Sequence, residues 1–189
     1  LAADTRGATA VEFAAIAPIL LMVLMGFMEL SYNIYAASLL EGSIQKAGRD
    51  GTLEGAEARG LAIDDRVRET ILDIVPDATV TFDRRAYIDY SNVERAERVT
   101  DLDDDGNCNG GEPFEDMNGN GRWDQDGGRA EMGGARDAVL YTVTVSYPRA
   151  FPVFGLIGMS DTVTTSSRTV LRNQPYGPQN RASAVGNCP

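Results

Sequence analysis

The chain has 189 residues, a formal net charge of −11 and no histidine. This length allows one compact domain with an added stem. The negative charge argues against a nucleic-acid partner, because phosphate binding requires clustered lysine and arginine. Without histidine there is no Ser-His or Cys-His pair, and no phosphate-binding glycine loop is present, so the sequence does not predict an enzyme.

The N-terminal stretch Ala8–Leu30 is apolar almost throughout, and no charged residue lies between Phe13 and Met28. At about 1.5 Å per residue this stretch reaches about 30 Å as a helix, which is the thickness of a bilayer core. The sequence therefore predicts a helix that lies in lipid or in an apolar assembly. The helical spacing of apolar residues continues to Gly48 or Gly51, and Pro18 lies inside the run.

Glu12 is the unusual residue of this segment. A carboxylate inside a membrane span is costly unless it is neutralised or paired. Glu12 is the fifth residue counted from Ala8, directly after Gly7. This layout is typical of type IV prepilins, in which a peptidase cuts after the glycine and frees an α-amino group. We expect Glu12 to pair with that amine of a neighbouring subunit. The alternative is an ordinary signal anchor whose glutamate lies near the headgroups.

The polar residues 1–7 leave two N-termini open. Either Leu1 is the mature terminus, or residues 1–7 are the end of a leader that is cut after Gly7. The spacing to Glu12 favours the second. Arg6 fits a cytoplasmic end before assembly, since positive charge favours that side.

The segment from Gly7 to about Gly51 resembles the TadE-like family, the pilin-like proteins of tight-adherence (Flp-type) pilus systems. The matching features are Gly7, Ala10-Val11-Glu12-Phe13, Pro18, the apolar run, Glu29 and the helix that follows. A weaker second patch covers Val143–Pro148 and then Thr162–Asn173. The resemblance implies a small envelope protein whose partners are other pilin subunits, a prepilin peptidase and the pilus machinery.

The rest of the chain predicts a head of mixed structure. We expect a helix over 52–75, a strand over 78–90 that breaks near Arg85, an irregular or strand segment over 91–99, and strands over 138–147 and 161–172. An apolar loop over 151–159 joins the last two strands. The predicted fold class is therefore α+β and pilin-like, with a small antiparallel sheet on the amphipathic half of the long helix. The predicted parts are 1–7 (leader or extension), 8–50 (stem helix), 51–100 with 129–172 (head), 101–128 (acidic insertion) and 173–189 (extended tail).

The acidic insertion, residues 101–128, contains the calcium-loop pattern D-x-D-x-D-G-x5-E. Alternate oxygens at positions one, three and five, a backbone carbonyl at seven and a bidentate glutamate at twelve suit a hard cation with six to eight oxygen ligands. We call Asp101–Glu112 the first loop. Its predicted calcium ligands are Asp101, Asp103, Asp105, Asn107 and Glu112.

The pattern recurs fifteen residues later in Asp116–Gly127, which we call the second loop. The twelfth position is Gly127, so the bidentate ligand is missing, and Asp126 is the expected substitute. Pro113 forbids an ordinary exit helix after the first loop. The alternative for both loops is a solvated, disordered acidic segment. The predicted ligands of the second loop are Asp116, Asn118, Asn120, Arg122, Asp124 and Asp126.

Cys108 and Cys188 are far apart and form no CxxC motif. In an exported chain we expect them to form a disulfide, with free thiols as the alternative. Together these features predict a structural pilin-class subunit of a tight-adherence pilus, which assembles through Gly7, Ala8, Glu12 and Pro18 and has a calcium-stabilised head. It would lie in the bacterial inner membrane before assembly and in the extracellular pilus afterwards. The alternatives are a membrane-anchored assembly factor and a calcium-dependent tip adhesin.

Overall fold

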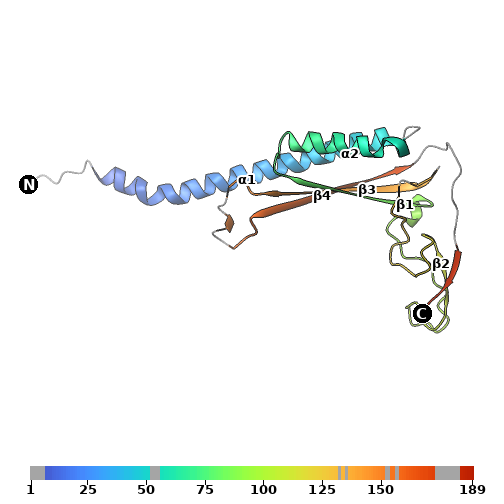
Figure 1. The fold of residues 1–189 in the computed structure, drawn as a ribbon. Helices are drawn as coiled ribbons and strands as arrows, with labels where there is room; N and C mark the ends of the chain where they lie inside the picture. The colour runs from blue at the N-terminus through green and yellow to red at the C-terminus, as the bar shows by residue number, and fades with distance from the viewer. Residues whose placement is uncertain are drawn as a thin grey trace, which may run out of the picture.

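The computed structural model describes residues 7–51, 56–131, 133–134, 136–151, 154–155, 158–172 and 184–189. Expectations for residues 1–6 and 173–183, and for parts of the 151–159 loop, lie outside the described residues. A long helix runs from the N-terminal end into the head, and the acidic insertion lies at the opposite end of the molecule (Figure 1). The elements in order are α1 (Ala8–Gly51), α2 (Ala56–Leu72), β1 (Thr79–Tyr87), the 3-10 helix η1 (Tyr90–Asn92), β2 (Pro113–Asp116), β3 (Ala138–Pro148), β4 (Thr162–Arg172) and β5 (Ala184–Asn187).

Helix α1 has two halves of different character. It is continuous over 44 residues, including Pro18. Every large apolar side chain from Val11 to Leu30 is 41–71% exposed. In the second half, the residues Ala36, Leu40, Ile44 and Ala47 are buried and recur every three or four positions. The predicted helix with an exposed apolar first half and a packed second half is confirmed.

The core of the head joins α1 to α2 and β3. Helix α2 contributes Ile63, Val67 and Ile71 at a spacing of four, which places them on one face of the helix. Strand β3 contributes alternate residues, because successive side chains of a strand point to opposite faces. The β3 core residues are Tyr141, Val143, Val145 and Tyr147. The α+β pilin-like class is therefore confirmed.

The main sheet has three antiparallel strands in the order β1-β3-β4. Its register pairs Thr79 with Ser146, and Pro148 with Thr162. The expected break near Arg85 is wrong, because Arg85 continues the ladder opposite Leu140. Both arginines of this stretch have carboxylate partners in the fold, since Arg84 bonds Asp64 and Arg85 bonds Asp126.

A second sheet pairs β2 with β5 and was not predicted. Pro113 lies opposite Asn187 in this pair, so the end of the predicted tail is a strand. A Cβ atom added at Gly186 would lie 2.4 Å from Cζ of Phe114, so only glycine lets this ring pack on the neighbouring strand. The 91–99 segment is largely irregular, with a single β-bridge between Val99 and Phe114.

Hydrogen bonds and an ion pair of Glu29 connect the middle of α1 to the head. This carboxylate is fully buried. Its Oε1 accepts from Arg149 at 3.3 Å, and its Oε2 accepts from the backbone N–H of Phe151 at 3.1 Å. Tyr147 donates to the Oδ1 atom of Asn33, one turn further along the helix. Glu29 therefore marks the point where α1 leaves the head and its apolar first half begins.

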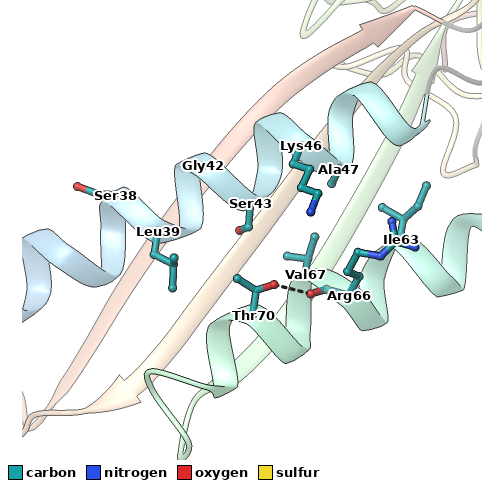
Figure 2. A pocket seen from close by; sticks show the side chains of 10 residues that line it. All are labelled: Ser38, Leu39, Gly42, Ser43, Lys46, Ala47, Ile63, Arg66, Val67 and Thr70. Carbon is teal, nitrogen blue, oxygen red and sulfur yellow. Dashed lines mark hydrogen bonds between the residues drawn. The ribbon is translucent and has the colours of Figure 1, made fainter.

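A groove of about 310 Å³ runs between α1 and α2. Lys46 and Arg66 point into the space between the two helices, and Thr70 donates to the carbonyl of Arg66 (Figure 2). Among the described residues its lining contains no carboxylate and no residue of the acidic insertion.

Candidate metal centre

The first loop brings its three aspartates together. Ligand oxygens of Asp101, Asp103 and Asp105 all lie within 4.8 Å of one another, so this group could hold a metal ion. Asp101 Oδ2 accepts from the N–H of Gly106 at 2.8 Å, which folds the loop back over its first residue. Gly106 has a φ of +77°, the left-handed conformation that glycine adopts without strain.

Backbone N–H groups hold the other carboxylates of the first loop. Asp103 Oδ1 accepts from the N–H of Asp105 at 3.2 Å, and Asp105 Oδ1 accepts from that of Asn107 at 2.7 Å. The bond from Asn107, followed by that from the Asn109 amide, holds the pKa of Asp105 below its usual range. The aspartate therefore stays ionised, which is the form that binds a cation.

Glu112, at the twelfth position, lies across the first loop. Its Oε1 accepts from the N–H of Leu102 at 2.6 Å, and its Oε2 accepts from the N–H of Asn109 at 3.4 Å. These donors are the second and ninth residues of the loop. Glu112 is only 3% exposed, so the loop ends on a buried carboxylate that is bonded to the loop's own backbone. The donor set is all oxygen and mostly anionic, which fits a hard divalent cation.

The second loop repeats this backbone geometry. Asp116 Oδ2 accepts from the N–H of Gly121 at 2.8 Å. Asn118 Oδ1 accepts from Asn120 N at 3.0 Å, and Asn120 Oδ1 accepts from Arg122 N at 2.7 Å. These are the bonds that positions one, three and five make in the first loop. The two loops therefore share one fold, although asparagines replace two of the aspartates.

Glu97 is the residue that the sequence analysis missed. It is 2% exposed and lies upstream of both loops. Its Oε1 accepts from the N–H of Met117 at 2.7 Å, and its Oε2 accepts from the N–H of Asp124 at 3.0 Å. Burial raises the pKa of Glu97, its backbone hydrogen bonds lower it, and the negative charge of Asp116 raises it. In the sequence, the one sign that another carboxylate completes the second loop was the absence of a glutamate at its twelfth position.

Asp126, the expected substitute, is engaged elsewhere. It forms an ion pair with Arg85 of β1, and its Oδ1 accepts from the N–H of Gly128 at 3.1 Å. Asp124 Oδ2 instead accepts from the side-chain amides of Asn118 and Asn120. The side chain of Arg122 is cationic and has no acceptor, so only the backbone carbonyl of this residue is suited to a cation.

A disulfide ties the first loop to the C-terminal strand. Cys108 and Cys188 are bonded in the structure, across 80 residues of sequence. The N–H of Cys188 also donates to the carbonyl of Glu112 at 2.8 Å. The covalent link and strand β5 therefore hold the end of the first loop against the second sheet.

The predicted assembly residues lie at the other end of the molecule. Gly7 precedes α1, and its carbonyl accepts from the N–H of Val11 at 3.2 Å. Ala8 opens the helix. Glu12 is exposed, and Pro18 lies in the exposed apolar half. The structure keeps these residues apart from the acidic insertion (Figure 1).

The fold defines a pilin-like class of protein, with one long apolar N-terminal helix and an antiparallel sheet packed on its second half. Residues 7–49 match a family model described as TadE-like protein, so this segment of the chain is TadE-like. The match ends before α2, so it covers neither the sheet nor the acidic insertion. No curated protein and no solved structure matches the chain.

Proposed function

We propose that the chain is a structural pilin-class subunit of a tight-adherence pilus. The observation that carries this proposal is the exposed apolar half of α1. Among the described residues one helix, Ala8–Arg49, is long and apolar enough to cross a membrane, and none of its most apolar window is buried in the head. Such a surface is stable only in lipid or against other apolar helices.

The TadE-like match supports a pilus rather than a general membrane anchor. The subunit would lie in the inner membrane through α1, and then leave lipid when α1 packs among the helices of neighbouring subunits. Glu12 is exposed on this half, where it is available to an amine of a neighbour. An ion pair there would fix the register between subunits, because an unpaired charge in an apolar core is costly.

We assign calcium to the first loop as part of this function. The group of Asp101, Asp103 and Asp105 and the buried Glu112 support it. Calcium suits the set better than magnesium, because six or more protein oxygens at flexible positions favour the larger ion. The bound ion would stabilise an insertion whose carboxylates otherwise repel one another.

Location of the protein tests the proposal. Filaments sheared from the cell surface should contain the chain, and its N-terminal residue after processing should be Ala8 by intact mass. A chain found only in the inner membrane, with none in sheared filaments, would support the membrane-anchored assembly factor instead.

A tip adhesin is the second candidate, and the position of the acidic insertion favours it. The insertion lies at the end of the molecule opposite the N-terminus, where a subunit at a filament tip would meet a surface (Figure 1). Replacing residues 101–128 with a short glycine-serine linker should then abolish calcium-dependent attachment. Unchanged attachment by such filaments would contradict the adhesin.

A further inference from the structure

We infer that the second loop forms a cation site of its own, completed by Glu97 from outside the loop. The ion is a hard divalent cation of the size of calcium. This inference goes beyond the proposed function, which requires only the first loop.

The contacts of Glu97 reproduce those of Glu112 position by position. Glu112 binds the N–H groups of the second and ninth residues of the first loop. Glu97 binds the N–H groups of Met117 and Asp124, the second and ninth residues of the second loop. A carboxylate from elsewhere in the chain thus occupies the place of the missing twelfth residue.

The position of Glu97 explains why the twelfth residue of the second loop, Gly127, has no side chain. A Cβ atom at this position would lie 3.1 Å from Cγ of Glu97 and 3.3 Å from Cβ of Met117. The stem of Glu97 therefore fills the space that a side chain at position twelve would need. Two backbone hydrogen bonds hold residues 95–97 beside the end of the second loop. The N–H of Gly127 donates to the carbonyl of Arg95 at 3.1 Å, and the N–H of Glu97 donates to the carbonyl of Asp124 at 3.0 Å.

Two acidic side chains of this site are buried. Glu97 is 2% exposed and Asp116 is 3% exposed. Among the described residues, no basic side chain forms an ion pair with Glu97, Asp116 or Asp124. Buried carboxylates are normally paired or bind metal, because burial of an uncompensated charge is costly. The site differs in this respect from an exposed acidic patch.

The oxygen count agrees with calcium. Asp116, Asn118 and Asn120 would each supply one side-chain oxygen, Arg122 its carbonyl, and Glu97 two, which makes about six before any water. Asp124, at the ninth position, would act through water, as this position often does. The single tryptophan of the chain, Trp123, lies in this loop, and its Nε1 donates to the carbonyl of Glu97 at 2.8 Å. Trp123 is therefore a luminescence donor that lies within the second loop.

Terbium luminescence excited through the tryptophan provides the test, with calorimetric calcium titration as the count of ions. The unmodified full chain in detergent should bind two calcium ions and should show luminescence that calcium displaces. Glu97→Gln should weaken one site by about 10- to 100-fold and reduce the luminescence. Glu112→Gln should weaken the other site and leave the luminescence. Asp126→Asn, the matched control in the same loop, should change neither.

A rescue variant separates ligation from structural damage. Glu97→Ala should lose the luminescence, and Glu97→Ala/Gly127→Glu should restore it, because the carboxylate returns to the twelfth position once the stem of Glu97 is gone.

A folded double variant that stays dark would overturn the inference. So would a dark unmodified chain, or Glu97→Gln with unchanged affinity. One calcium ion lost in Glu112→Gln but not in Glu97→Gln would overturn the second site and leave the first intact. No calcium at all would overturn both.

Discussion

At the scale of the residue, the two glutamates of α1 have opposite environments. Glu29 is fully buried and bonded to Arg149, Asn33 and the backbone of Phe151. Glu12 is exposed on the apolar half of the helix. The sequence distinguishes them only by position. Glu29 therefore links α1 to the head, and Glu12 has the exposure that the proposed contact with a neighbouring subunit requires.

Glu29→Gln should destabilise the head. The substitution leaves Arg149, which is 13% exposed, without its charge partner, and the loss of one member of a buried ion pair costs about 3–5 kcal/mol. The free energy of unfolding, measured by denaturant titration of the full chain in detergent, should fall by about 3 kcal/mol. Glu12→Gln is the matched control and should leave it unchanged. Equal stability of the two variants would contradict the role given to Glu29.

Glu12→Gln should instead impair assembly. An amide cannot neutralise the α-amino group of a neighbour, so the amount of this chain in sheared filaments should fall by at least about tenfold, which corresponds to about 1.4 kcal/mol per contact. Membrane insertion and total expression should not change. Glu41→Gln, at an exposed position in the packed half of the same helix, should incorporate normally. Normal incorporation of Glu12→Gln would remove Glu12 from the assembly mechanism.

At the scale of the element, the long helices and strands could be predicted from the sequence and the short strands could not. Helix α1 and strands β3 and β4 are long enough for their apolar period to be unambiguous, and each was predicted almost to its ends. Strands β2 and β5 have only four residues each, and β5 pairs with a partner about 70 positions away. Four residues hold too few alternations to identify a strand, and the pairing depends on tertiary structure.

The same limit applies to the candidate site. The positions of Asp101, Asp103, Asp105 and Glu112 follow from local spacing, because one short loop holds them all. Glu97 lies 19 positions before Asp116, and no local pattern connects the two. Backbone hydrogen bonds between 95–97 and 124–127 bring its carboxylate to the second loop.

Removal of calcium should expose the acidic insertion to proteolysis. At about 100 times its dissociation constant, calcium raises the free energy of local opening of the segment that binds it by about 2.7 kcal/mol. A chelator should therefore speed cleavage within residues 101–128 by about a hundredfold. Fragments must be separated after reduction, since the disulfide between Cys108 and Cys188 holds the pieces together. Cleavage in the β3–β4 hairpin serves as the internal control. Equal cleavage of the insertion with and without chelator would contradict the metal assignment.

At the scale of the whole molecule, the chain separates two tasks along its length. The exposed apolar half of α1 lies at one end, and the acidic insertion lies at the other (Figure 1). The buried half of α1, with α2 and the sheet, joins them. This separation would let the helix enter a membrane or filament while the metal loops stay in water, where calcium is available. Most of the acidic residues of the chain lie outside α1.

The state of the native protein in the absence of detergent tests the central claim most directly. The account predicts that the full chain fractionates with membranes or sheared filaments, and that without detergent it is found only in assemblies, by light scattering and sedimentation. A freely soluble monomer, with the Val11–Leu30 segment protected from hydrogen exchange by packing on its own head, would contradict the account.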